Sequence, residues 1–241
     1  QLIKKYWLYN MLVKKIFNFL SKFHYNSIYN YSKKLNFEIM IDVGSHQGEF
    51  ISRFLQYKKI KKFFSFEPNK ILFKKLHDKY KLNKRIHLFD YALGENNSNK
   101  KFFLSNLSYN STMSSFNKDS NYLKFKNLII KDQKNQKFTI IKQKKFDQVF
   151  KIQNIKNSFL KIDVEGYEYN VLKGASKKIK DTKYILIEHQ FSNQYQNNFE
   201  KVKKLLIKYN FIKVKSFYYP TLHYRDILFI NKRYKDTINH L

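Results

Sequence analysis

Cysteine is absent from the 241 residues of this sequence. Its absence excludes disulfide-rich scaffolds, thiolate metal sites and cysteine nucleophiles. Long uncharged apolar runs are also lacking, because the longest, such as residues 6–13, fall far short of the ~20 residues that span a membrane. No secretory signal with a small-residue cleavage site is visible, so we expect a cytoplasmic protein. The start at Gln1 rather than Met predicts a truncated chain.

Acidic residues and arginine are both scarce, whereas lysine is abundant. The sequence carries 48 Lys and Arg residues against 18 Asp and Glu residues, which gives a formal net charge of +30, and only Arg53, Arg85, Arg225 and Arg233 are arginines. Base readout and bidentate phosphate binding favour arginine, so we attribute the lysine excess mainly to AT-rich codon usage. A polyanionic or anionic-membrane partner is the alternative, because the field of the chain exists whatever its origin.

Residues 1–36 predict a basic amphipathic helix followed by a polar connection. Apolar residues recur at roughly helical spacing from Leu2 to Leu20, and lysines fill other positions. We favour a helix that packs on the main domain. The alternative is a helix that binds a membrane surface or a partner protein.

Residues 37–234 predict one α/β domain, and a hydrophobic content of 43% excludes a disordered chain. Short apolar runs alternate with helical patterns, which favours a parallel sheet covered by helices. Two final runs, 211–217 and 227–230, suit a terminal antiparallel pair. The earlier runs are 38–43, 63–66, 86–91, 159–164 and 184–188, and the helical patterns between them are 50–57, 71–80 and 167–172.

Residues 95–146 interrupt this alternation. They are rich in Asn, Ser and Lys, and they contain two possible strands at 101–104 and 138–141. We interpret them as an insertion or a substrate-facing loop with a hairpin. Residues 235–241 are expected to form a tail.

Glycine is scarce, and two of the five glycines share one short loop. Gly44 and Gly48 follow the first apolar run and precede a helical pattern. Such a unit presents backbone N–H groups at the sheet edge where ligands bind. The loop lacks both the three-glycine dinucleotide pattern and the Gly-Lys-Ser/Thr of a P-loop, so it is a poor phosphate site, and Asp42 suits a cationic ligand group better. A tight turn without a ligand is the alternative.

Acids at the next two strand ends predict a bound nucleoside. Glu67 lies 19 residues beyond Gly48, and an acid about 20 residues on can accept both hydroxyls of a ribose. Pro68 then stops the strand. Asp90 ends the third strand, where it can hold an adenine amino group. The alternatives are a solvated loop glutamate and a turn aspartate before Gly94.

Four further ionisable residues follow the fourth and fifth strands. Asp163 and Glu165 alternate at one strand end, and Glu188 and His189 end the next. Clustered acids and a histidine at such a place can act as base, orienting group or metal ligand. Each residue alone could equally be a cap or a surface charge.

Several of these segments together resemble the FkbM-type family of S-adenosylmethionine-dependent methyltransferases, in family order over residues 39–230. The most specific is Leu-Lys-Ile-Asp-Val-Glu-Gly, residues 160–166, with Leu-Lys-Gly-Ala after it. The sequence departs from the family at Ser45 and His46, where Ala-Asn is frequent. Residues 1–36 and 95–136 match nothing firm. The other matching segments are 41–48, 66–68, 92–94 and 187–189.

The resemblance implies a Rossmann-like sandwich with a mostly parallel seven-stranded sheet and a terminal antiparallel strand. It also implies S-adenosylmethionine as cofactor and methylation of hydroxyl groups on sugars, glycans or secondary metabolites. We expect no resident metal. The residues that would hold the cofactor are Asp42, Gly44, Ser45 and Gly48 at the methionine end, Glu67 at the ribose and Asp90 at the adenine.

Catalysis is expected from Asp163, Glu165, Glu188 and His189. We favour His189 or Glu165 as the base, because an unperturbed histidine is poised at neutral pH and a glutamate among acids can be raised toward it. A divalent ion held by Asp163 with Glu188 or His189 is an alternative.

Two rival functions come from other classes. One is a nucleic-acid methyltransferase, which the net charge favours, although no Asn-Pro-Pro-Tyr-like motif or RNA-binding module is recognisable. The other is a non-enzymatic binder whose basic N-terminal helix docks on anionic lipid or on a partner.

Overall fold

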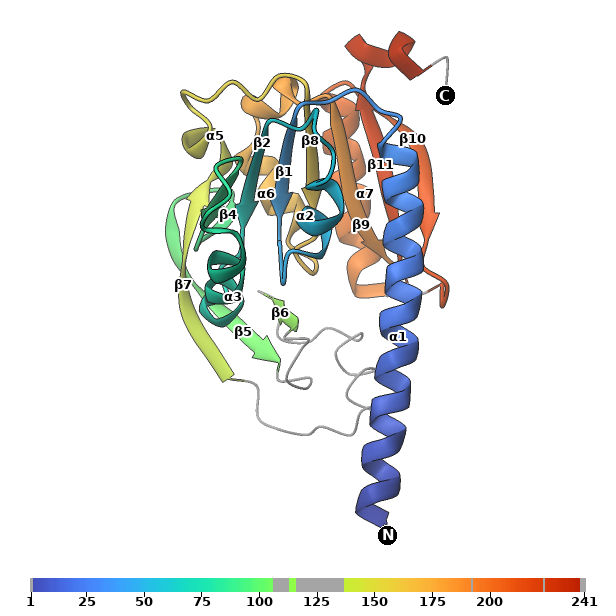
Figure 1. Cartoon of the computed structure of the whole chain (residues 1–241). Coiled ribbons are helices and arrows are strands. Elements are labelled where there is room, and N and C mark those ends of the chain that lie inside the picture. Colours follow the sequence, from blue (N-terminus) through green and yellow to red (C-terminus); the bar gives the residue numbers. More distant parts are fainter. Residues whose placement is uncertain (1, 106–112, 116–136, 192, 223, 239–241) are drawn as a thin grey trace.

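The computed structural model describes residues 2–105, 113–115, 137–191, 193–222 and 224–238. Most of the central part of the predicted 95–146 insertion, namely residues 106–112 and 116–136, therefore lies outside the described residues. Figure 1 shows the whole chain, with a central sheet, flanking helices and one long N-terminal helix.

A seven-stranded sheet in the order β10-β11-β9-β8-β1-β2-β3 forms the centre of the fold. The strands β3, β2, β1, β8 and β9 pair in parallel, whereas β11 is antiparallel to both β9 and β10. The predicted terminal antiparallel pair is confirmed, and the last strand lies between β9 and β10. The bounds are β1 (Ile39–Val43), β2 (Lys62–Phe66), β3 (Ile86–Phe89), β8 (Ser158–Ile162), β9 (Tyr184–Gln190), β10 (Phe211–Tyr218) and β11 (Tyr224–Asn231).

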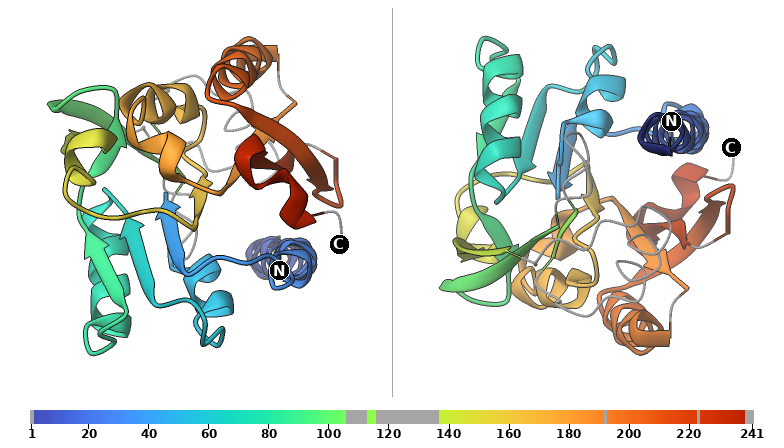
Figure 2. Two further views of the ribbon diagram at one scale, coloured as in Figure 1. Left: turned by 90° about the horizontal axis from the view of Figure 1, so that it is seen from above. Right: turned by 90° about the horizontal axis from the view of Figure 1, so that it is seen from below.

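Helices cover both faces of this sheet, as the end-on views in Figure 2 show. Side chains alternate along each strand, so Met40 of β1 joins the core under α1, α2 and α3, whereas Ile41 and Val43 join the core under α5, α6 and α7. Because both faces are buried, the parallel strands are almost continuously apolar in sequence. The helices are α1 (Leu2–Ser32), α2 (Glu49–Phe54), α3 (Lys70–Tyr80), α5 (Phe146–Val149), α6 (Glu168–Gly174) and α7 (Asn193–Lys208), with 3-10 turns η1 (Lys178–Asp181) and η2 (Lys232–Ile238).

A second, four-stranded sheet has the order β4-β7-β5-β6. Its strands are β4 (Ala92–Gly94), β5 (Ser98–Ser105), β6 (Met113–Ser115) and β7 (Lys137–Lys145). β5 and β7 pair antiparallel from Ser98 opposite Gln143 to Leu104 opposite Lys137. The two strands expected at 101–104 and 138–141 are therefore present, and both are longer than the sequence predicted.

α1 continues through the stretch that the sequence predicted as a polar connection. Ile28 is fully buried in the core shared with α2 and α3, and Leu35 just after the helix is 1% exposed. Ser21 Oγ lies 3.0 Å from Tyr219 Oη. Burial of this face against the domain stabilises the helix despite its Asn and Tyr residues, because tertiary packing outweighs weak helix propensity. The favoured expectation that this helix packs on the domain is confirmed for its C-terminal half.

Candidate functional site

The loop between β1 and α2 is built around two left-handed glycines. Gly44 has φ +86° and Gly48 has φ +78°, a region that L side chains rarely occupy. A Cβ on Gly44 would lie 1.9 Å from the Asp163 backbone oxygen, and one on Gly48 would meet Leu76 and Tyr80 of α3. From the sequence we expected these glycines to allow a ligand to approach the backbone. The structure adds a second reason, since neighbouring protein already fills the space that a side chain would need.

Ser45 and His46 tie this loop to the end of β2. The N–H groups of Gly44 and Ser45 donate to the Phe66 carbonyl, and Ser45 Oγ is hydrogen bonded to Ser65 Oγ. His46, with φ +49°, contacts Glu49 through Nδ1 at 3.0 Å. Burial lowers the pKa of His46, but the hydrogen bond and charge of Glu49 outweigh burial, so the pKa is raised overall.

A buried cation lies between two acids at the ends of β1 and β8. Lys161 Nζ is 3.5 Å from Asp42 Oδ1 and 3.0 Å from Asp163 Oδ2. Asp42 is 1% exposed, and neither of its carboxylate oxygens accepts a hydrogen bond from any described residue. Burial raises the pKa of Asp42 to about 6, although Lys161 opposes this shift.

Lys161 is a site residue that was not predicted from the sequence. Burial lowers its pKa, but Asp163 and Asp42 outweigh burial and hold the pKa well above its ordinary value, so Lys161 stays charged. The sequence does contain an indication of this role, because Lys161 is flanked by apolar residues inside a buried strand and a buried charge requires a partner.

Glu67 is fixed at the end of β2 by two backbone donors. Its Oε2 accepts from the His46 N–H and its Oε1 from the Asn69 N–H, both at 2.8 Å. The residue is 5% exposed, and burial raises its pKa to about 7 against these hydrogen bonds. A carboxylate offers about four acceptor positions, so its oxygens can accept further hydroxyl donors. Asp90 follows β3 at the same sheet edge and is exposed.

Glu165 and Glu188 are brought together by one amide. Gln190 Nε2 donates to Glu165 Oε2 and to Glu188 Oε1, each at 2.8 Å. Burial raises the pKa of Glu188 well above its ordinary value, and the charges of Asp163 and Glu165 act in the same direction. Glu165 has φ +51°. Both acids were predicted from the sequence, whereas Gln190 was not, because nothing in its own segment indicates that it links them.

His189 lies on the opposite face of the sheet from Glu188. Successive side chains of a strand point to opposite faces, and His189 stacks on Phe199 of α7 with ring centroids 3.8 Å apart. Arg225 Nε donates to its Nδ1 at 3.3 Å. Burial and the charge of Arg225 lower the pKa of His189 to about 4. The reason given for favouring it, an unperturbed pKa, is therefore wrong, and its part in catalysis stays a prediction.

Helix α1 closes the face on which Asp42, Lys161 and Glu188 lie. His24 Nε2 is 2.7 Å from Asp226 Oδ2, and both side chains are almost fully buried. Asp226 is the partner of Glu188 in the β11–β9 register. Within the described residues, no three His, Asp or Glu side chains are grouped to hold a metal ion. The carboxyl edge of the parallel strands thus carries one cation among several acids.

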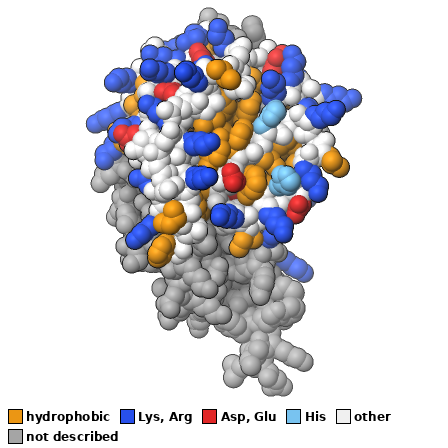
Figure 3. Space-filling view, turned by 90° about the vertical axis from the view of Figure 1, so that its left-hand side faces the viewer, with side chains coloured by type: hydrophobic (Ala, Val, Ile, Leu, Met, Phe, Trp, Pro, Cys, Tyr) orange, Lys and Arg blue, Asp and Glu red, His pale blue; other side chains and the backbone are white. Residues whose placement is uncertain are grey.

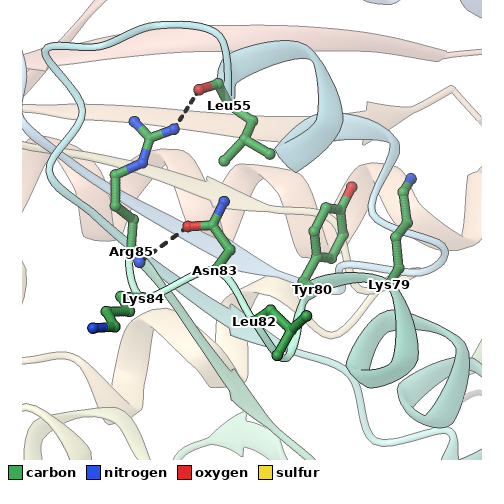
Figure 4. A pocket seen from close by; sticks show the side chains of 7 residues that line it. All are labelled: Leu55, Lys79, Tyr80, Leu82, Asn83, Lys84 and Arg85. Atoms are coloured by element: carbon green, nitrogen blue, oxygen red, sulfur yellow. Dashed lines mark hydrogen bonds between the residues drawn. The ribbon is translucent and has the colours of Figure 1, made fainter.

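A hollow of the described surface lies elsewhere. It has a volume of about 560 Å³ and is lined by Leu55, Lys79, Tyr80, Leu82, Asn83, Lys84 and Arg85 (Figure 4). Arg85 directly precedes β3, so the hollow lies toward the amino ends of the parallel strands. Its guanidinium donates to the carbonyls of Leu55 at 2.6 Å and Ile60 at 3.0 Å. This arginine binds carbonyl groups that follow the C-terminal end of α2. The hollow is therefore a structural junction and not the candidate site.

Comparison with known proteins agrees with this geometry. The methyltransferase FkbM domain matches residues 42–213. An FkbM methyltransferase from Methylobacillus flagellatus KT has a TM-score of 0.53 at 17% identity over 80% of this chain, and this chain covers 43% of that one. The methyltransferase domain of bacterial CtHen1-C has a TM-score of 0.50 at 11% identity, with 88% of this chain and 98% of that chain covered. No curated protein matches the sequence.

Both structural likenesses show the fold, which is a Rossmann-like methyltransferase sandwich. The family match covers most of the sheet and every cofactor-binding residue that the sequence predicted. The chain therefore belongs to the FkbM methyltransferase domain family.

Proposed function

We propose that this methyltransferase modifies a hydroxyl group of a sugar, a glycan or a secondary metabolite. The observation that carries the proposal is the acidic cluster formed by Asp163, Glu165 and Glu188 at the ends of β8 and β9. The whole chain has only 18 acidic residues, yet Asp163, Glu165 and Glu188 lie together at the candidate site. Carboxylates accept hydrogen bonds from hydroxyls and repel phosphates, so the local field suits a neutral, hydroxyl-rich acceptor.

The described residues fit the cofactor at three points. Asp42 has two buried oxygens without a hydrogen bond, which suits a cationic amino-acid group. Glu67 is fixed at a strand end with acceptor capacity left for ribose hydroxyls. Asp90 lies at the next strand end, where an adenine amino group can donate to it. When bound, S-adenosylmethionine supplies an activated methyl group on a sulfonium.

Residues of the chain then have to orient the acceptor and remove its proton. Glu165 is half-buried, and we assign it as the base that accepts the proton of the acceptor hydroxyl. Glu188 has a raised pKa beside it, so it can hold a proton and donate a hydrogen bond to the acceptor. Gln190 fixes both carboxyl groups. Positioned proton transfer typically contributes 10²–10⁴-fold in rate, and alignment contributes more.

The test is a comparison of turnover with cofactor affinity in matched variants. With a panel of sugar and glycan acceptors, Glu165→Gln should lower turnover about 10²-fold or more while cofactor affinity by calorimetry stays within about tenfold. His189→Ala should change turnover less than Glu165→Gln, because its neutral ring with a low pKa is a weak base. Glu38→Gln, at the amino end of β1 in an exposed pair with Lys61, is the control and should leave both quantities unchanged.

Normal turnover in Glu165→Gln would show that the base is assigned to the wrong residue. Methylation of RNA but of no sugar in the panel would contradict the acceptor class.

The net charge of +30 keeps an RNA acceptor as the second candidate. Figure 3 shows Lys and Arg side chains scattered over the face it presents, rather than gathered in one stripe. Filter binding of RNA across a salt series tests this candidate, because phosphate neutralisation by lysines makes affinity fall steeply with salt. Affinity that does not depend on salt would count against it.

A further inference from the structure

Helix α1 has two faces with different surroundings. The inner face is fixed to the domain: His24 is 1% exposed and contacts Asp226, and Ile28 is fully buried. Ser21 reaches the β10–β11 hairpin through Tyr219. This anchoring fixes which side of the helix faces outward.

The outer face carries an exposed apolar stripe. Ile16 is 53% exposed, Phe19 is 69% exposed and Phe23 is 65% exposed. Their spacing of three and four residues places them on one side of the helix, and the same spacing in the sequence continues back to Leu12. Single exposed apolar residues are ordinary, but an aligned series of large ones indicates an interaction surface.

Lysines accompany this stripe, and acids are missing. Lys15 and Lys22 are exposed and lie seven residues apart, so they share one side of the helix next to the stripe. Residues 1–37 contain seven lysines and no Asp or Glu, since Glu38 is the first acid of the chain.

The stripe lies beside and just before the anchored residues of α1, and the helix continues beyond it toward Leu2. Figure 1 shows the helix running past the carboxyl edge of the sheet, toward its N-terminus. The exposed fractions of Ile16, Phe19 and Phe23 leave the stripe accessible to a partner surface. Within the described residues, no helix is both long and apolar enough to cross a membrane.

We propose that α1 docks this methyltransferase on an anionic lipid bilayer surface. Ile16, Phe19 and Phe23 enter the boundary between headgroups and acyl chains, while Lys15 and Lys22 bind anionic headgroups. An apolar stripe flanked by lysines is typical of helices that lie in the plane of a membrane surface. The charge of the whole chain, +30, attracts it to the same surface.

Charge also disfavours the other occupants of this face. In a symmetric pair of chains, two lysine-rich helices without acids would face each other and repel. A nucleic acid would engage the lysines and leave three large apolar side chains in water. The lipid surface satisfies both the charge and the apolar stripe.

Vesicle flotation with the full chain tests the proposal. Wild type should bind vesicles of phosphatidylcholine with about 30% phosphatidylserine, bind pure phosphatidylcholine at least tenfold more weakly, and lose binding as salt rises. Replacing Ile16, Phe19 and Phe23 together by serine should lower partitioning at least tenfold. The matched control replaces Leu82 and Ile152, which are 90% and 89% exposed far along the chain from α1, by serine and should bind like wild type.

A second variant keeps the test decisive if the triple serine variant fails to fold. Lys15→Glu with Lys22→Glu alters only exposed positions and should lower partitioning on anionic vesicles at least tenfold, with an unchanged melting temperature. Equal binding of wild type to neutral and anionic vesicles would overturn the proposal. So would a stable dimer by light scattering that the serine variant abolishes, because the stripe would then be covered by a second copy.

Discussion

Replacing Lys161 with methionine probes the energy stored in the buried charge cluster. The side chain of Lys161 is 5% exposed, and it lies 3.5 Å from Asp42 and 3.0 Å from Asp163. Methionine has a similar volume but no charge, so the change removes the cation and leaves two acids facing each other. Removing one partner of a buried ion pair typically costs about 3–5 kcal/mol, because an uncompensated charge stays buried. We expect a loss of this size at pH 8.

The pH dependence distinguishes this cause from a simple packing defect. In the wild type, burial raises the pKa of Asp42 to about 6, above its ordinary value. Ionised Asp42 therefore costs folding free energy above pH 6, and this cost is lost as pH falls and the carboxyl group takes up a proton. Without Lys161 the pKa of Asp42 rises further. The stability gap between the variant and wild type should then be largest at pH 8 and should narrow toward pH 5.

Urea unfolding followed by circular dichroism at pH 8 and pH 5 measures this gap. The control is Lys61→Met, which removes an exposed lysine 2.9 Å from Glu38 and should cost less than about 1 kcal/mol at both pH values. A gap that is the same at pH 8 and pH 5 would refute the electrostatic reasoning. A Lys161→Met variant as stable as wild type at pH 8 would refute it more directly.

Two further predictions follow from the same edge of the sheet. Burial raises the pKa of Glu67 to about 7, so S-adenosylmethionine affinity should fall as pH drops below 7. The Glu67→Gln variant should bind this cofactor about 1.5–3 kcal/mol more weakly and should lose this pH dependence. Calorimetry at pH 6 and pH 8 checks both expectations, and a Gln variant with wild-type affinity would contradict the ribose role. The His24→Ala variant should lower the free energy of unfolding by about 1.5–3 kcal/mol. The reason is that Asp226, which is 4% exposed, stays buried without its partner at 2.7 Å. A loss below about 0.5 kcal/mol in urea unfolding would show that α1 is held mainly by apolar packing.

The sequence by itself determined the sheet and the chemistry at its edge. Buried parallel strands have apolar residues on both faces, so they appear as short continuous runs whatever their neighbours are. The left-handed turns at Gly44 and Gly48 require glycine locally. Acids such as Glu67 and Asp163 follow the strands directly, and the carboxyl ends of parallel strands meet at one edge, so their proximity could be predicted from position alone.

Only the tertiary structure decided which of these residues act together. Local alternation separates His189 from Glu188, but the stacking on Phe199 and the contact with Arg225 that lower its pKa come from distant elements. The link through Gln190 depends on the register of two strands. The contact between His24 and Asp226 joins residues 202 positions apart. Burial, charge and hydrogen bonding set each pKa, and all three depend on packing that no local pattern contains.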